Sequence, residues 1–253
     1  MNPLVSIITP SFNQGEFIEK TIESILNQTY NNIEYIIVDG LSTDKTMSVI
    51  DKYKPKITKV IHEKDNGQSD AINKGFKMAS GTLIGWINSD DILYPHAVEA
   101  IVELYTKHND GAIFYGNNLD IIDDNGNKIK TIHKPIPNRD FLLKRNYDVI
   151  QQGSFYNTQF VKEVNLIDPT LHYCMDLDLW LRLLKFGPIY AVEGNPIAAF
   201  RRWNETKTST GGINFLNDIK NTLIKNGAPP FSKTLNKVRY QTLKLLAKQL
   251  ITS

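Results

Sequence analysis

The first 116 residues alternate between short, uninterrupted apolar runs and stretches with helical periodicity, and this alternation limits the possible folds more than any other feature. Runs and helix-period stretches follow one another at residues 4–9, 16–27, 33–38, 46–53, 59–62, 69–78 and 83–87. Strands that are buried on both faces of a parallel sheet have solid apolar sequences, and helices connect one such strand to the next. The sequence therefore predicts an α/β fold with an open, mostly parallel sheet flanked by helices.

Smaller elements are predicted in the second half of the chain. We expect a hairpin around an Asn-Gly pair, a helix that ends at a Gly-Pro pair, two strands, a polar loop and a last helix after a Pro-Pro break. The hairpin is expected at residues 121–129, the helix at 178–186, and the two strands at 189–192 and 197–200. The polar loop is expected at 206–213 and the last helix at 233–251.

Charge separates the tail from the rest of the chain. The net charge is +2, but residues 218–253 carry seven Lys or Arg and a single acid, Asp218. Four lysines have helical spacing beside a leucine-rich face: Lys233, Lys237, Lys244 and Lys248. A basic amphipathic helix can lie on an anionic membrane surface, or it can pack on the body with its lysines in water. Both interpretations stay open.

Several classes of protein are excluded by what the sequence lacks. The single cysteine, Cys174, rules out an internal disulfide and a paired-thiol metal site. No run approaches the ~18 apolar residues of a membrane span, and the N-terminus lacks the features of a signal peptide. There is no phosphate-binding glycine loop, and the basic tail lacks interleaved stacking aromatics. We predict a cytoplasmic protein that does not bind nucleic acid, with peripheral contact to the inner face of the cell membrane left open.

Carboxylates follow two of the predicted strands. Asp39 ends the second apolar run, and Asn88-Ser89-Asp90-Asp91 follows the fourth. Because ligands bind at the carboxyl ends of strands in open α/β sheets, we expect these acids at one crevice. Asp90 and Asp91 would suit Mg²⁺ or Mn²⁺ together with substrate phosphates. A helix cap at Asp91 is an equally good explanation.

Asp39 and residues 70–77 have both functional and structural explanations. Asp39 can accept the N3–H of a uracil ring, or it can be a turn residue before Gly40. Asp70, Asn73 and Lys74 share a helix face with Lys77. That face can meet phosphates, although a solvated face is the simpler expectation.

A second acidic site lies at residues 172–182. Asp178 and Arg182 form an ordinary i, i+4 ion pair. Asp176 precedes the predicted helix and is either its N-cap or a general base. Trp180 can stack on a sugar ring or pack in the core.

Taken together, these motifs resemble glycosyltransferase family 2, the inverting nucleotide-sugar transferases with the GT-A fold. Ordered matches extend over about 200 residues. They lie at residues 5–13, 21–30, 37–44, 70–75, 85–91, 175–182 and 200–208. The resemblance implies a GT-A domain over 1–217, with a nucleotide-sugar half (1–116) and an acceptor half (117–217). A basic helical tail follows over 218–253.

The resemblance also implies roles for single residues. Asp176 falls at the position of the catalytic base, and Asp90 and Asp91 at those of the metal and ribose acids, in an order that we leave open. Trp180, Arg201 and Arg202 are candidates for contacts with the acceptor or the diphosphate. The nucleotide would contact Pro10, Phe12, Asp39, Asn73, Asp70, Lys74 and Asp90.

Three positions depart from the family pattern. The first acid of the Asp-x-Asp motif is Asn88, the Arg often found before the helix Asn is Ile72, and the His of a late Arg-x-His motif is Trp203. Metal binding then relies on Asp90 and Asp91. Two interpretations of Trp203 stay open: the change removes a third ligand, or Arg201 or Arg202 holds the diphosphate instead.

The expected activity is that of a Mn²⁺- or Mg²⁺-dependent, inverting hexosyl- or N-acetylhexosaminyltransferase. It would move a sugar from a nucleotide donor, a UDP-sugar by preference, to a glycan or lipid-linked acceptor in bacterial surface polysaccharide synthesis. The alternative is a nucleotide-sugar-binding module of the same fold that has lost its chemistry. A nucleotidyltransferase would need a basic, glycine-rich triphosphate loop near the N-terminus, and residues 10–16 do not provide one.

Overall fold

The apolar runs of the first half form four parallel strands of one sheet. A computed structural model describes residues 2–204 and 211–252, with side chains described as far as residue 247. The strands are β1 (Val5–Ser11), β2 (Ile33–Asp39), β3 (Lys59–His62) and β4 (Leu83–Trp86). They are connected by α1 (Ile18–Leu26), α2 (Thr46–Tyr53) with the 3₁₀ turn η1 (Lys54–Lys56), and α3 (Gln68–Met78). All seven residues of β1 are buried, as the solid apolar pattern predicts.

Three later strands extend this sheet to seven. They are β6 (Ile113–Gly116), β9 (Ser154–Asn157) and β10 (Ile189–Val192), and the order across the sheet is β10-β6-β9-β4-β1-β2-β3. Only β9 runs antiparallel to its neighbours. The predicted α/β fold with an open, mostly parallel sheet is therefore confirmed. Because the sheet takes strands from both sides of residue 116, the two halves of the main domain share one core.

A smaller sheet has the order β5-β11-β7-β8. Its strands are β5 (Ile92–Leu93), β7 (Asn118–Ile122), β8 (Lys128–His133) and β11 (Ala198–Arg201). The antiparallel pair β7–β8 is the predicted hairpin. β5 follows directly after the 88–91 turn and pairs with β11, so the small sheet holds that turn from one side.

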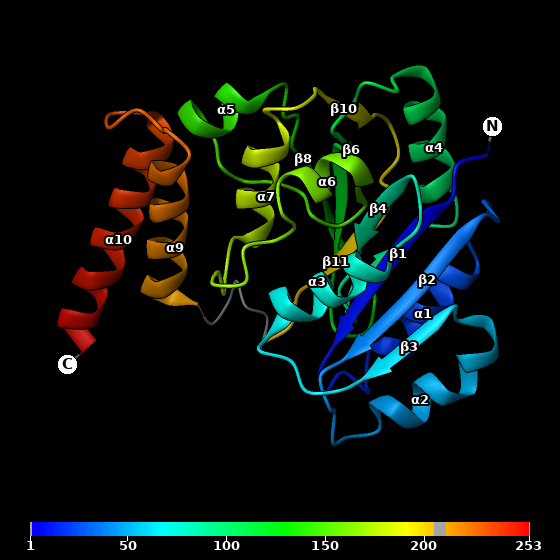
Figure 1. Cartoon of the computed structure of the whole chain (residues 1–253). Helices are drawn as coiled ribbons and strands as arrows, with labels where there is room; N and C mark the ends of the chain where they lie inside the picture. Colours follow the sequence, from blue (N-terminus) through cyan, green and yellow to red (C-terminus); the bar gives the residue numbers. More distant parts are fainter. Residues whose placement is uncertain (1, 205–210, 253) are drawn as a thin grey trace.

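The remaining helices follow β5 along the chain (Figure 1). They are α4 (Ala97–Lys107), α5 (Arg139–Lys144), α6 (Thr158–Glu163), α7 (Met175–Leu183), α9 (Gly212–Lys225) and α10 (Lys233–Thr252). Most of the predicted loop over 206–213 lies outside the described residues, and α9 begins at its end. α9 and α10 pack side by side at one edge of the molecule.

The helix that carries the second acidic site begins earlier than the sequence predicts. α7 starts at Met175 rather than Asp178, and it ends at Leu183. Its N-cap is Cys174, which makes no side-chain capping bond, so none of the usual capping residues marks the start. Asp176 therefore lies in the first turn of the helix, and the prediction that it precedes the helix is wrong.

The strand order changes direction beside β1. The chain moves outward from β1 to β2 and β3, and α3 then carries it back to β4 on the other side of β1. α3 packs across β1 and β2, on the face opposite α1 and α2 (Figure 1). In open α/β sheets such a switch point opens a crevice at the carboxyl ends of the strands, where Ser11 and the 88–91 turn lie.

Candidate active site

The end of β2 is a closed polar cluster in this structure. Ser11, Asp39 and His62 end three adjacent strands and pair in register. The carboxylate of Asp39 has no exposed surface. It accepts hydrogen bonds from the backbone N–H and hydroxyl of Ser42, at 2.9 and 2.5 Å, and lies 2.7 Å from Nδ1 of His62. In this structure the carboxylate of Asp39 is therefore enclosed by protein and not accessible to a nucleotide base.

The end of β1 combines an exposed aromatic ring with unpaired polar atoms. Phe12 has 58% of its surface exposed, whereas Pro10 is buried within the strand. Ser11 Oγ and Gln14 Oε1 are buried and make no hydrogen bond among the described residues. An exposed ring beside unpaired polar atoms suits a base that stacks and also forms hydrogen bonds.

Among the described residues, the carboxylate of Asp90 has one side-chain partner, and it keeps acceptor capacity. The indole N–H of Trp203 donates to Asp90 Oδ2 at 3.0 Å. Burial raises the pKa of Asp90, and the hydrogen bond from Trp203 and the charge of Arg201 oppose that shift. An indole nitrogen can only donate, so Trp203 orients the carboxylate and cannot be a metal ligand.

Asp91 is enclosed by donors on every side. Its carboxylate accepts from Asn88 Nδ2 (3.0 Å), Gln152 Nε2 (2.9 Å) and the backbone N–H of Arg201 (3.0 Å). Burial and the charge of Asp90 raise its pKa well above the usual range. These bonds join the 88–91 turn to β11 and to the segment before β9. The contacts of Asp91 are those of a structural acid.

Asp90 is the better-placed carboxylate for a divalent cation at this site. Among residues 2–204 and 211–252, no three His, Cys, Asp or Glu side chains lie close enough to hold a metal. Both oxygens of Asp91 already accept hydrogen bonds and its side chain is fully buried, so Asp90 is the carboxylate better placed to coordinate. One protein carboxylate with substrate phosphates and water is a common arrangement for Mg²⁺, so the residues fit a cation that arrives with a diphosphate.

The polar face of α3 is largely used within the protein. The amide of Asn73 donates to the carbonyl of Ile167 and accepts from its N–H, at 2.8 and 3.0 Å. Lys74 donates to the carbonyl of Lys64 and pairs with Glu63 at 2.9 Å. Asp70 accepts from the N–H of Asn66. The structure therefore does not favour the expected nucleotide contacts of Asn73, Lys74 and Asp70, because each of these side chains binds a loop to the helix.

The first turn of α3 joins the two acidic sites. Gln68 Nε2 donates to Asn88 Oδ1 at 2.8 Å, and the hydroxyl of the next residue, Ser69, donates to the carbonyl of Leu171 at 2.8 Å. The 88–91 turn and the segment that leads into α7 therefore both rest on this turn. No side chain caps the helix here, and its N–H groups form an anion-attracting end.

Asp176 is half-buried in the first turn of α7. It accepts one hydrogen bond, from the N–H of Leu177 to Oδ1 at 2.8 Å. Burial raises the pKa of the Asp176 carboxyl, and the charge of Lys134 partly opposes that rise. A carboxylate with spare acceptor capacity and raised proton affinity has the properties of a general base.

Asp178 and Trp180, one turn further on, are part of the core. Asp178 is fully buried and accepts from Arg182 Nε at 2.7 Å and from Asn226 Nδ2 at 3.3 Å. Its pair with Arg182 is the predicted one, but it is buried rather than exposed. Trp180 has no exposed surface, donates to Tyr156 and packs on Tyr115. The expectation that Trp180 contacts the acceptor is wrong because its ring is enclosed by protein.

The two arginines after β11 differ in their contacts. Arg201 is buried and donates to the carbonyls of Asp90, Asp123 and Asp124, and its guanidinium lies 5.0 Å from the centre of the Phe17 ring. The guanidinium therefore stabilises the loops around Asp90. Arg202 is exposed, and it remains the better candidate for a diphosphate.

Some residues of the site were not predicted from the sequence. His62 binds Asp39, and Gln68, Gln151 and Gln152 surround Asn88 and Asp91. For His62 a signal exists, because it ends a predicted strand parallel to the one that ends at Asp39. The glutamines meet the turn from segments 20 and about 60 residues away, which no local pattern reveals.

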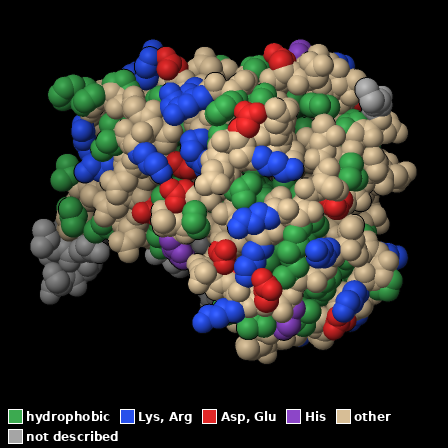
Figure 2. All heavy atoms as spheres, in the orientation of Figure 1, with side chains coloured by type: hydrophobic (Ala, Val, Ile, Leu, Met, Phe, Trp, Pro, Cys, Tyr) green, Lys and Arg blue, Asp and Glu red, His purple; other side chains and the backbone are tan. Residues whose placement is uncertain are grey.

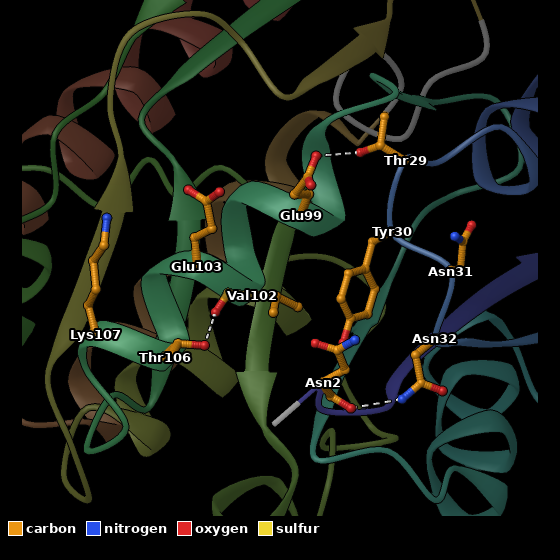
Figure 3. A pocket seen from close by; sticks show the side chains of 10 residues that line it. All are labelled: Asn2, Thr29, Tyr30, Asn31, Asn32, Glu99, Val102, Glu103, Thr106 and Lys107. Atoms are coloured by element: carbon orange, nitrogen blue, oxygen red, sulfur yellow. Dashed lines mark hydrogen bonds between the residues drawn. The ribbon is translucent and has the colours of Figure 1, made fainter.

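A separate hollow in the described surface lies at the opposite edge of the sheet. It has a volume of about 710 Å³ and is lined by residues before β1 and β2 and along α4, including Asn2, Asn32, Glu99 and Lys107. Figure 3 shows two bonds that tie its wall together, from Thr29 to Glu99 and from Asn32 to Asn2. Since it lies at the amino ends of the strands, it is separate from the candidate active site.

Comparison with known proteins gives consistent results for sequence and fold. The family model described as Glycosyl transferase family 2 matches residues 6–166. A putative teichuronic acid biosynthesis glycosyltransferase, TuaG, of Bacillus subtilis is 33% identical over 194 residues, which are 73% of each chain. Chondroitin synthase of Escherichia coli is 30% identical over 74% of this chain, and the match spans 27% of the enzyme. An uncharacterized glycosyltransferase of Rickettsia bellii is 31% identical, and the match spans 28% of its length.

Solved structures share the fold at low sequence identity. Staphylococcus aureus TarS, in complex with UDP-GlcNAc, superimposes with a TM-score of 0.69 at 15% identity, over 96% of this chain and 71% of that one. The mannosyltransferase PcManGT of Pyrobaculum calidifontis, with GDP-Man and Mn²⁺, gives 0.67 at 14% identity, over 100% and 76%. The family match covers most of the described core and both carboxylates of the 88–91 turn, and the chain therefore belongs to glycosyltransferase family 2.

Proposed function

We propose that this chain is an inverting glycosyltransferase that takes its sugar from a UDP-sugar and depends on Mn²⁺ or Mg²⁺. One observation carries the proposal. The first turn of α3 joins the turn that holds Asp90 to the segment that leads to Asp176, and each of these acids retains acceptor capacity. The arrangement offers one acid for a cation that neutralises the departing diphosphate and a second acid that can take the proton of the acceptor.

Residues of the first half would bind the nucleotide. Phe12 stacks on the base, and Asp39 accepts its N3–H once the 41–43 loop has opened. The uncapped end of α3 and Arg202 face the negative charge of the diphosphate. Asp90, oriented by Trp203, would hold the cation, which when bound neutralises the departing diphosphate.

Residues of the second half would activate the acceptor. Asp176 takes the proton from the acceptor hydroxyl as that oxygen attacks the anomeric carbon and the bond to the diphosphate breaks. The proton ends on Asp176 and the electron pair on the leaving phosphate oxygen, so no covalent intermediate with the enzyme is formed. The configuration at the anomeric carbon is inverted.

We further propose that the acceptor is a glycan or a lipid-linked saccharide of a bacterial surface polysaccharide. The name of the B. subtilis relative supports this class of product, and the UDP-GlcNAc bound to TarS supports a UDP-sugar, with an N-acetylhexosamine as one candidate for the sugar. A lipid-linked acceptor would bring the protein to the inner face of the membrane. In the described residues, no helix is both long enough and apolar enough to cross a bilayer.

Thermal unfolding with UDP, GDP, dTDP and CMP, each with and without Mn²⁺, tests the donor. A ligand at about 100 times its dissociation constant adds about 2.7 kcal/mol to the free energy of unfolding. UDP with Mn²⁺ should stabilise the protein most. A larger effect of GDP, the nucleotide of the PcManGT ligand, would show that the base is assigned wrongly.

Release of UDP from a panel of UDP-sugars, with candidate acceptors, separates an enzyme from the alternative of a binding module. Asn88 and Trp203 are the residues that motivate the alternative. An enzyme releases UDP in proportion to time and to enzyme concentration. A module that binds UDP but never releases it from a sugar would overturn the proposed activity.

A further inference from the structure

Half of the large hydrophobic side chains exposed in the described structure lie in 23 residues at its C-terminal edge. Five of the ten are there: Ile224 (52%), Phe231 (87%), Tyr240 (68%), Leu243 (65%) and Leu246 (44%). All belong to α9, α10 or their connection. Isolated exposed apolar side chains are common in proteins, but a concentration of them indicates an interaction surface.

The inner face of α10 is already occupied, so its outer face is the one that remains. Thr234, Leu235 and Val238 are buried against the body. Lys237 pairs with Asp148 at 3.1 Å and lies 4.7 Å from the centre of the Tyr147 ring, whose hydroxyl donates to Gln241. The four lysines expected on one stripe of the helix therefore do not all face the same surroundings. Lys237 fastens the helix, and Lys248 lies outside the residues whose side chains are described.

The outer face is basic as well as apolar. Lys233, Tyr240 and Lys244 are seven and four residues apart and share one stripe of α10, with Leu243 beside it. Lys233 and Lys244 are exposed and have no acidic partner among the described side chains. Residues 219–253 contain no Asp or Glu. Figure 2 shows hydrophobic and Lys or Arg side chains interleaved along this edge.

We propose that this outer face of α10, with Phe231 at its beginning, binds the surface of an anionic lipid bilayer. Aromatic and leucine side chains enter the boundary between headgroups and acyl chains, and lysines attract anionic headgroups. A second copy of the chain is a poor occupant, because a two-fold contact would bring two basic faces together without acids to pair with them. The inference does not depend on the proposed function, since lipid binding is measured without donor or acceptor.

Vesicle flotation of the full chain tests the surface. Vesicles of phosphatidylcholine with about one third phosphatidylglycerol are compared with vesicles of phosphatidylcholine alone. One variant combines Phe231→Ser with Leu243→Ser, and another combines Lys233→Gln with Lys244→Gln. The control combines Ile129→Ser with Lys130→Gln, which makes the same kinds of change at the exposed strand β8. The melting temperature of each variant verifies that it folds.

The wild type and the control should float with the anionic vesicles and remain behind with the neutral ones. The lysine variant should lose about thirtyfold in partitioning to the anionic vesicles, which corresponds to two surface lysines. The apolar variant should lose binding at low salt and also at high salt. Equal flotation with neutral vesicles, no flotation of the wild type, or variants that float like the wild type would each overturn the proposal. If the wild type instead forms a dimer that the apolar variant abolishes, the face is a contact between copies.

Discussion

The turn at 88–91 and the beginning of α7 each carry two carboxylates within three residues, and the structure treats the two members of each pair differently. Asp91 accepts hydrogen bonds from three donors and Asp178 from two, and both are fully buried. Within the part of the chain that the structure describes, Asp90 has one side-chain donor and Asp176 has one backbone donor. An ionised carboxylate offers about four acceptor sites, so Asp90 and Asp176 keep the most sites for a ligand, and unlike Asp91 and Asp178 they are only partly buried.

The difference separates acids that hold the fold from acids available for chemistry. Asp91 ties the 88–91 turn to β11, and Asp178 ties α7 to α9 through Asn226. Burial raises the pKa of Asp90 and of Asp176. Because burial raises the pKa of Asp91 as well, the smaller number of donors, and not the pKa, distinguishes the available acids. In each pair, an acid with free acceptor sites thus lies close to an acid whose hydrogen bonds fix the local backbone.

The largest expected effect is on turnover. Asp176→Asn is nearly isosteric and can still accept from the N–H of Leu177, but it cannot take up the proton of the acceptor. We expect sugar transfer to fall by about 10²–10⁴-fold, with UDP affinity and melting temperature near those of the wild type. Steady-state transfer, calorimetric UDP binding and thermal unfolding measure the three quantities. Transfer within a few-fold of the wild type would remove Asp176 from the reaction.

The next largest effect is on stability. Asp178→Asn leaves the guanidinium of Arg182 without its carboxylate in a site where Asp178 is completely buried and Arg182 is 18% exposed. Breaking such a pair should cost about 3 kcal/mol of the free energy of unfolding, rather than the ~0.2–0.5 kcal/mol of an exposed helix pair. Urea unfolding checks this. A loss below 1 kcal/mol with abolished transfer would exchange the roles of Asp176 and Asp178.

The pH dependence of transfer sharpens the comparison further. A general base works in its deprotonated form, so the rate falls about tenfold per pH unit below its pKa. Because burial raises the pKa of Asp176, the acid limb should begin above the ~3.9 of an ordinary aspartate. The limb should disappear from the residual activity of Asp176→Asn. An unchanged limb in that variant would assign it to another group, with Asp90 the first to examine.

The smallest effect on stability is expected at Asp168, an acid in an exposed ion pair that belongs to neither of the two carboxylate pairs. Asp168 pairs with Lys225 at 2.8 Å, and hydrogen bonds from Lys225 and Thr170 lower its pKa to about 2 in spite of some desolvation. A lowered pKa means stabilisation that is present above about pH 4 and is lost as the pH falls toward 2. Since Lys225 is 60% exposed, Asp168→Asn should cost only about 0.5–1 kcal/mol at neutral pH. Urea unfolding at pH 7 and pH 3 should show the difference between the two proteins shrinking at the lower pH.

The fold was largely predictable because the burial of the strands is a local signal. Solid apolar runs such as 4–9 and 33–38 became β1 and β2, and the Asn-Gly pair marked the β7–β8 hairpin. The start of α7 was predicted three residues late because Cys174 provides no capping side chain. Helix ends without such a residue have no local sequence signal.

The site was less predictable because its decisive contacts join distant segments. Asn73 meets Ile167, 94 residues away, and Trp203 meets Asp90, 113 residues away. The resemblance gave Asn73 a nucleotide contact that its hydrogen bonds do not favour, and the side-chain type of Trp180 suggested a sugar contact that its packing rules out. The sequence also left Asp90 and Asp91 equivalent, and only the donors around each carboxylate distinguish them.

Thermal unfolding of Asp90→Asn and Asp91→Asn, each with UDP and with or without Mn²⁺, tests the division within an acid pair most directly and needs no acceptor. Asp90→Asn should melt close to the wild type without ligand and lose the additional stabilisation that Mn²⁺ gives with UDP. Asp91→Asn should be less stable by about 2 kcal/mol without ligand, because its amide would oppose one of the three donors, yet keep the Mn²⁺ increment. Loss of the increment in Asp91→Asn at an unchanged melting temperature, with the increment intact in Asp90→Asn, would contradict the assignment.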